Sequence, residues 1–323
     1  MTLSKVIVSS VLLSFAATVS QAETWDMATP YPESTFHTKN IIKFAEDVAQ
    51  RTDGQIEIKV HSAGSLIKHP EIKNAIRTQQ IPIGEFFVSI LANENPIFAL
   101  DSVPFVATSF EDAYNLYQAS KEELENNLSR QGVKLLYSVA WPPQGLYSDR
   151  EIEKVDDLRG VKFRVYNPQL ARLAHLVGAV SAQVEVPDIP QAFSTGRVNT
   201  MLTSTSTGVD TKGWDYMDYF YDVKAYLPKN AVAINQQVFD GLDADTQAAL
   251  VAAAEEAEER GWEMAEADHL SMRKILEENG MNVSDGTDEL NKGLHKIGEQ
   301  MAEEWSKEAG EVGAAILDDY RSR

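Results

Sequence analysis

The sequence predicts an α/β protein with two lobes. Strand and helix patterns alternate along the chain, which is typical of α/β layers built on mostly parallel sheets. A chain of 323 residues is long for one compact unit, so its length favours two lobes. One helical pattern of roughly 35 residues would be on the order of 50 Å long, which exceeds one small lobe and can lie across both.

The elements of the first half follow from apolar spacing. Strands show period-two alternation or short apolar runs, and helices show apolar residues three and four positions apart, as Ile41, Phe44, Ala45 and Val48 do. Strands are predicted at 24–28, 55–60, 81–90 and 133–141, and helices at 36–51, 69–79 and 109–131.

The second half repeats the alternation and ends in helices. Strands are predicted at 161–165, 181–186, 198–204 and 230–239, and helices at 168–179 and 188–196. The long helix is predicted to begin near Asp243 or Asp245, which suit a helix N-cap, and to stop at Gly280. A last helix is predicted at about 286–320.

The N-terminus is typical of a secretory signal peptide. MTLSKVIVSSVLLSFAATVSQAE has an early Lys5, an apolar stretch, and small residues at Ser20 and Ala22 that suit signal peptidase. We expect residues 1–22 to be removed and the mature chain to start at Glu23. A membrane anchor is the alternative, but the apolar stretch is too short and a polar segment follows at once.

Composition excludes several function classes. The sequence has no cysteine, which removes thiolate metal sites, cysteine nucleophiles and disulfides. It carries 49 Asp and Glu against 29 Lys and Arg, a net charge of −20, which disfavours nucleic acid and anionic membranes as partners. No later stretch is apolar enough for insertion into a membrane.

Motifs for catalysis are absent. The sequence has no GxSxG, HExxH, Walker loop or GxGxxG, and its six histidines show no metal-ligand spacing. We therefore expect no metal and no cofactor. An exported protein without recognisable chemistry suggests capture of a ligand. An exported enzyme of the lyase or hydrolase type, using scattered carboxylates, remains the alternative.

The stretch GVKFRVYNP places Arg164 inside an apolar run that otherwise looks like a buried strand. A buried charge without a partner costs several kcal/mol or more. Arg164 therefore needs an anionic partner, which is either an acidic side chain of the protein or a group on a ligand.

Several stretches together resemble the solute-binding proteins of TRAP transporters. DDLRGVKFRV resembles the central signature of that family, HSAGSLIKHPEIKNAI its segment around the second helix, and DSVPFV its apolar segment. STGRVNTM and the long helix follow in the order that the family has. The resemblance covers essentially the whole chain after the signal peptide.

This resemblance implies the two-lobed periplasmic binding protein fold, with a ligand cleft between the lobes and a long helix spanning both. Lobe one would take 23–146 plus 232–270, and lobe two 147–231 plus 271–323. The protein would be periplasmic, would capture a small polar solute, and would deliver it to membrane permease subunits driven by an ion gradient. Arg164 would meet the carboxylate of the ligand, since a guanidinium forks onto a carboxylate with two charge-assisted hydrogen bonds.

Three positions depart from the family pattern. Tyr147 stands where many members carry a second arginine, Thr203 where many carry an asparagine, and Glu85 near a place usually lined by small polar residues. A single arginine with nearby acids suits a ligand that bears an amine, either a zwitterion or an amino alcohol. An ordinary organic acid remains equally open.

If the ligand bears an amine, Glu85 or Glu33 would bind the ammonium group, and aromatic side chains would face it through cation–π contact. If the ligand has an amine but no carboxylate, Arg164 would pair with one of these acids. The predicted ligand contacts are Arg164, Tyr147, Thr203, Glu85, Trp141, Trp214, Tyr31 and Glu33.

Overall fold

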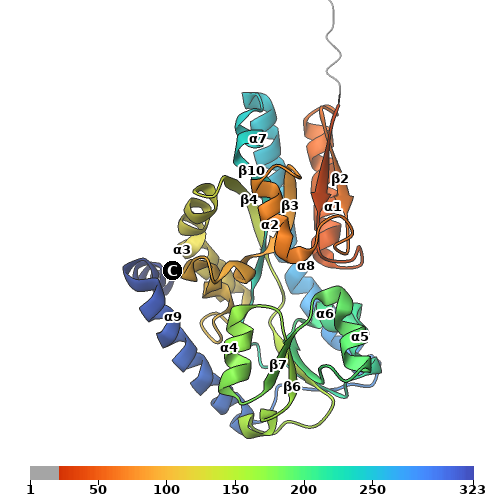
Figure 1. Cartoon of the computed structure of the whole chain (residues 1–323), viewed down its shortest axis with the longest axis vertical. Coiled ribbons are helices and arrows are strands. Elements are labelled where there is room, and N and C mark those ends of the chain that lie inside the picture. The colour runs from red at the N-terminus through yellow and green to blue at the C-terminus, as the bar shows by residue number, and fades with distance from the viewer. Residues whose placement is uncertain (1–21) are drawn as a thin grey trace, which may run out of the picture.

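Two sheets, each covered by helices, form the two lobes of the protein (Figure 1). This is a computed structural model that describes residues 22–323. The predicted signal peptide, residues 1–22, lies outside the described residues apart from its last position. The predicted two-lobed α/β class is confirmed.

The first lobe contains a five-stranded sheet in the order β2-β1-β3-β10-β4. Its strands are β1 (Glu23–Ala28), β2 (Ile56–His61), β3 (Ile83–Phe87), β4 (Val133–Ala140) and β10 (Lys229–Asn235). β1 runs parallel to β2 and β3, whereas β10 runs antiparallel to β3 and β4. The late strand β10 thus returns the chain to the middle of the first sheet.

The second lobe contains a six-stranded sheet in the order β11-β9-β5-β8-β6-β7. Its strands are β5 (Gly145–Ser148), β6 (Lys162–Val165), β7 (Val180–Gln183), β8 (Thr200–Thr203), β9 (Tyr219–Tyr221) and β11 (Asn282–Ser284). β6 lies parallel to β7 and β8, whereas β5 is antiparallel to β8 and β9. In each sheet a single strand, β10 in the first and β5 in the second, runs antiparallel to its neighbours, while the other strands share one direction. The expectation of mostly parallel sheets is therefore confirmed.

Helices cover both sheets, and several of them begin at side-chain caps. They are α1 (Phe36–Arg51), α2 (Ile72–Arg77), α3 (Phe110–Ser129), α4 (Pro168–Leu176), α5 (Ile189–Ser194), α6 (Thr205–Asp210), α7 (Gln236–Asp240), α8 (Ala244–Glu278) and α9 (Asp288–Ser322). The side chains of Ser109, Asn167 and Asp243 each accept a backbone N–H of the first turn that follows.

The predicted strand at 230–239 was wrong in its last residues. The strand ends at Asn235, whose side-chain oxygen accepts the N–H groups of Gln237 and Val238 and so starts α7. The short strands β5, β9 and β11 were not predicted, since three or four residues carry little periodicity.

The long helix α8 joins the two lobes, as predicted. Its first half packs on the first lobe, where Asn40 Nδ2 donates to Ala257 O at 2.8 Å. Its second half reaches the second lobe, where His269 Nε2 lies 3.5 Å from Asp222 Oδ2. α8 therefore links the lobes along their length (Figure 1).

Helix α9 also packs on both lobes. Leu290 and Leu294 lie in the core of the second lobe. Beyond them, Trp305 Nε1 donates to Pro96 O at 2.7 Å, and the Tyr320 hydroxyl donates to Val106 O at 3.1 Å, both in the first lobe. The predicted division placed 271–323 in lobe two, and its residue boundaries remain a prediction.

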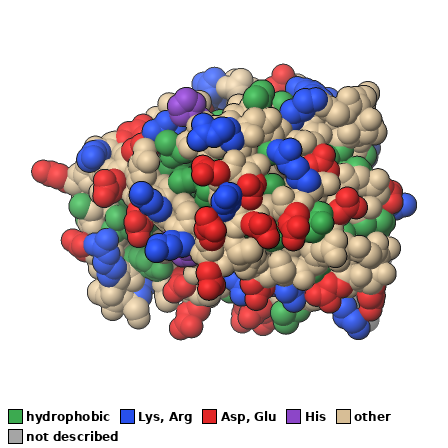
Figure 2. Space-filling view, turned by 90° about the horizontal axis from the view of Figure 1, so that it is seen from below, with side chains coloured by type: hydrophobic (Ala, Val, Ile, Leu, Met, Phe, Trp, Pro, Cys, Tyr) green, Lys and Arg blue, Asp and Glu red, His purple; other side chains and the backbone are tan. Residues whose placement is uncertain are grey.

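The surface carries charges of both signs, with acidic and basic side chains interspersed over the face in Figure 2. Among residues 22–323, no helix combines the length and apolarity that crossing a bilayer requires. In the same residues, no three His, Asp or Glu side chains gather as metal ligands would.

Gly261 allows α8 to approach the first lobe closely. An added Cβ there would lie 2.4 Å from Val139 Cγ2 and 2.7 Å from Asn40 Nδ2. We expect Gly261→Ala to lower the free energy of unfolding by about 1–3 kcal/mol through overpacking, although alanine alone would stabilise a helix by about 0.5–1 kcal/mol. Urea denaturation measures the change.

Gly241→Ala is the matched control, because its added Cβ would meet nothing nearer than 3.3 Å. A stabilised Gly261→Ala variant would show that the approach of α8 is not tight.

Candidate ligand-binding site

Arg164 lies near the end of β6, between the parallel strands β7 and β8, and its side chain is 2% exposed. Its Nε donates to Val184 O at 2.9 Å, and its guanidinium carbon lies 4.5 Å from the centre of the Tyr166 ring. Burial lowers the pKa of Arg164 from its usual value, and Tyr166 and Glu185 oppose that shift. No acidic oxygen of the described residues lies within 4 Å of the guanidinium, so the internal pairing that was one alternative is not formed.

Arg164 faces a cavity between the lobes, where the empty space, including the part that is open to solvent, amounts to about 350 Å³. Side chains from both lobes, and from the segment that crosses between them, form its walls. The lining residues are Tyr31, His69, Phe87, Trp141, Gln144, Arg164, Tyr166, Glu185, Val186, Thr203, Ser204 and Thr207. Strands β6 and β8 both end at this cavity, as expected for a site at the carboxyl ends of parallel strands.

Four of the predicted ligand contacts line this cavity: Arg164, Thr203, Trp141 and Tyr31. The other four, Tyr147, Glu85, Trp214 and Glu33, are not among its lining residues. Tyr147 is fully buried behind the cavity, where its hydroxyl donates to Ser204 O at 3.1 Å. Trp214 is partly buried and packs against the core of the second lobe, and Glu33 is exposed.

Glu85 lies one layer behind the cavity wall, in β3, and is 1% exposed. It accepts hydrogen bonds from the Thr29 hydroxyl and, at 2.7 Å, from Asn230 Nδ2. Asn230 Oδ1 in turn accepts from Trp141 Nε1 at 2.9 Å and from the Tyr31 hydroxyl at 3.2 Å. Glu85 therefore orients two aromatic walls through Asn230.

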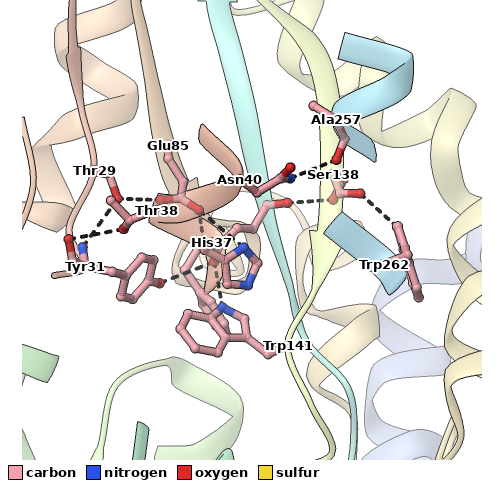
Figure 3. Close-up of polar contacts among 12 residues, drawn as sticks. Thr29, Tyr31, His37, Thr38, Asn40, Glu85, Ser138, Trp141, Ala257 and Trp262 are labelled. Atoms are coloured by element: carbon pink, nitrogen blue, oxygen red, sulfur yellow. Dashed lines mark hydrogen bonds and ion pairs between the residues drawn. The ribbon is translucent and has the colours of Figure 1, made fainter. Parts of the chain in front are cut away.

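The side chains of Tyr31 and Trp141 extend from this network toward the second lobe (Figure 3). His37 Nδ1 lies 3.5 Å from Glu85 Oε1, and burial holds the pKa of His37 well below its usual value. Burial also raises the pKa of Glu85 to about 7, although the hydrogen bonds from Thr29 and Asn230 oppose this shift. Glu85 and His37 are thus poorly suited to form an ion pair.

Hydrogen bonds between the lobes close the cleft over the cavity. His69 Nδ1 lies 3.1 Å from Glu185 Oε2, and Asn167 Nδ2 donates to Ser89 Oγ at 2.8 Å. At another part of the rim, Asp210 accepts hydrogen bonds from Ser34 and Thr35. The structure is therefore the closed form of a two-lobed protein.

Eight lining residues were not predicted from the sequence: His69, Phe87, Gln144, Tyr166, Glu185, Val186, Ser204 and Thr207. Tyr166 had a usable signal, because it stands two positions after Arg164 and strand alternation places both on one side. Glu185 follows β7, the parallel neighbour of β6, so its place near Arg164 also followed from topology. His69 and Gln144 had no such signal, since their approach depends on how the lobes meet.

Two lobes that close on a cavity are typical of a solute-binding protein. The sequence matches the family described as bacterial extracellular solute-binding protein, family 7, over residues 27–308. The chain belongs to that family, whose structures include the periplasmic receptors of TRAP transporters. It is a binding protein and not an enzyme, which excludes the lyase or hydrolase alternative.

Similar solved structures include two extracytoplasmic solute receptors from Bordetella pertussis, DctP6 and DctP7, each described as binding pyroglutamic acid. They share 44% and 41% sequence identity with this chain, cover 93% of it and all of their own length, and give TM-scores of 0.92. A C4-dicarboxylate-binding periplasmic protein from Rhodobacter capsulatus is 22% identical over 68% of this chain and 67% of its own.

Glu85 makes stability depend on pH. Its pKa of about 7 in the folded protein lies above the value of 4.5 expected when unfolded, so between these values the unfolded state has lost a proton that the folded state keeps. The contribution of Glu85 to the free energy of unfolding therefore falls as pH rises through this window, by on the order of 3 kcal/mol. His37 acts in the opposite direction, because its lowered pKa makes its contribution rise as pH approaches the usual histidine value of 6.5.

We expect Glu85→Gln to remove this fall, because glutamine does not ionise. Urea denaturation at about pH 5 and pH 7.5 measures the effect, with Glu57→Gln, at an exposed position of β2, as the control. An equal fall in Glu85→Gln and in the unmodified protein would assign the pH dependence to another group.

Proposed function

We propose that this chain is the periplasmic receptor of a TRAP transporter and binds pyroglutamate, or a small cyclic monocarboxylate close to it. The observation that carries the proposal is Arg164, a buried guanidinium that faces the cavity between the lobes and has no acidic partner within 4 Å among the described residues. A ligand carboxylate is the partner that its charge requires.

The walls also suit the rest of such a ligand. Pyroglutamate has a carboxylate, a lactam C=O and N–H, and a small apolar ring. The cavity offers hydroxyl groups at Thr203, Ser204 and Thr207 for the polar atoms, and the side chains of Phe87 and Trp141 for the ring. A few polar groups within mainly apolar walls are typical of small-molecule sites.

The related receptors support the same ligand. DctP6 and DctP7 are described as binding pyroglutamic acid, and a marine metagenome TRAP protein described as specific for pyroglutamate is 38% identical, with a TM-score of 0.92. It covers 94% of this chain and all of its own length.

The amine alternative has less support. A cationic ligand would share the cavity with Arg164, and Glu85 and Glu33, the acids invoked for it, are not among the lining residues. Trp141 and Tyr31 do line the cavity, and they suit the apolar ring of a lactam equally well.

The remaining parts of the proposal concern location and delivery. Removal of the predicted signal peptide, residues 1–22, would release the protein into the periplasm. There, after closure around its ligand, it would deliver the solute to the membrane permease subunits of the transporter.

Arg164→Met should abolish tight binding of the acid. Removing one member of a buried charge pair costs about 2–5 kcal/mol, which is an affinity loss of about 30- to 4,000-fold. Thermal denaturation and titration calorimetry against L-pyroglutamate, C4-dicarboxylates, amino alcohols and amino acids measure the loss and the ligand class.

Arg197→Met is the matched control, because Arg197 is exposed and donates to Gln183 O at the surface. A rise in melting temperature with amines alone would overturn the proposed ligand. Retained acid binding in Arg164→Met would overturn the role of Arg164.

A further inference from the structure

The carboxylate of Glu185 lines the same cavity as Arg164 but is held by the other lobe. Glu185 follows β7 in the second lobe, and its Oε2 lies 3.1 Å from His69 Nδ1 in the first lobe. No ion pair within 4 Å joins Glu185 to Arg164 in the described part of the chain. Each charge therefore remains available to a ligand between them.

The hydrogen bonds of His69 fix which of its ring nitrogens carries the proton. Phe87 N–H donates to His69 Nε2 at 3.0 Å, so Nε2 must be unprotonated. The proton then lies on Nδ1, which donates to Glu185. His69 is neutral in this arrangement, and it orients Glu185 without neutralising it.

Glu185 keeps its negative charge. Burial alone would raise its pKa, but the hydrogen bond from His69 and the electrostatic effect of His69, followed by the charge of Arg164, outweigh burial and hold the pKa below its usual value. Among the lining side chains, Arg164 and Glu185 are therefore the two charged groups, one of each sign.

This charge pattern distinguishes between ligands. One ligand carboxylate can bind Arg164, but a second that approached Glu185, at the rim of the cavity with 29% of its side chain exposed, would be repelled by its like charge. A ligand N–H, in contrast, would find in Glu185 a charged acceptor that is already oriented.

We propose that Glu185 determines the specificity of this site: it accepts a hydrogen bond from a ligand N–H and excludes ligands with a second carboxylate. This inference rests on the proposed function, because it assumes that Arg164 binds the first carboxylate. It gives a physical reason for a lactam acid to be preferred over a dicarboxylate of similar size.

Glu185→Gln tests the inference because His69 constrains the new amide. The His69 Nδ1–H requires an acceptor, so the amide oxygen takes that place and the NH₂ group is left for the cavity. The variant then offers a donor where the unmodified protein offers a charged acceptor. It should bind a ligand with an N–H group more weakly, and a ligand with a second carboxylate more tightly, than the unmodified protein does.

The experiment compares three ligands by titration calorimetry on the unmodified protein and on Glu185→Gln. L-pyroglutamate has the N–H, its lactone analogue 5-oxotetrahydrofuran-2-carboxylate replaces the N–H by oxygen, and glutarate has two carboxylates. Asp188→Asn is the matched control, because it also removes one negative charge, three positions along the chain from Glu185. The side chain of Asp188 is exposed, lines an outer crevice and makes no capping hydrogen bond.

We expect Glu185→Gln to lower the affinity for L-pyroglutamate at least tenfold and to raise the affinity for glutarate at least tenfold. The ratio of the affinities for L-pyroglutamate and for the lactone should also fall. Asp188→Asn should bind all three ligands as the unmodified protein does. Melting temperatures without ligand, which should agree for all three proteins, establish that the variants are folded.

Unchanged ligand ratios in a folded Glu185→Gln variant would overturn the role of Glu185 and leave the proposed function intact. If the unmodified protein binds glutarate but not pyroglutamate, both proposals fail. If it binds the lactone but not pyroglutamate, the proposed ligand and the proposed N–H contact are both wrong. In that case, whether Glu185→Gln binds glutarate more tightly than the unmodified protein does decides whether Glu185 excludes a second carboxylate. Binding of none of the three ligands would overturn both proposals.

Discussion

A buried guanidinium that lacks an acidic partner is the constraint on which the rest of this structure depends. Arg164 is 2% exposed and makes one hydrogen bond to the backbone, at Val184 O. Such a group is costly unless an anion completes it. The cavity, the closure of the lobes and the aromatic walls all surround the position where that anion would lie. The fold therefore tolerates a local cost in stability in order to hold a binding site.

The two lobes contribute different chemistry to the cavity. The second lobe supplies the charges, Arg164 and Glu185, while the first supplies the aromatic walls Tyr31 and Trp141. Those walls are held by Asn230, which is held in turn by the buried Glu85, so a group without access to the ligand still fixes the shape of the cavity. Only the closed form brings these separate sets together.

Local patterns predicted most of the fold, because apolar spacing and caps act within a few residues. The cap at Asp243 and the extent of α8 are examples, and Arg164 was found because a charge in an apolar run is itself a local anomaly. Glu85 shows the limit. Its sequence context marked it as unusual, but whether it faced the cavity or lay behind it depended on Asn230, which lies on the distant strand β10. His69 and Gln144 depended in the same way on how the lobes meet, which no local pattern records.

The charge of the whole protein and the charge of its proposed ligand have the same sign. The chain carries −20 overall, so long-range attraction does not favour an anion, but surface charges are screened beyond about 8 Å at physiological ionic strength. Inside the closed cavity the balance reverses. A pair of opposite charges 4 Å apart is worth about 1 kcal/mol in bulk water and about 4 kcal/mol at an effective dielectric constant of about 20. Closure thus strengthens the hold of Arg164 on an anion, and separation of the lobes, by letting water return, weakens it. The same interaction can therefore serve both capture and release.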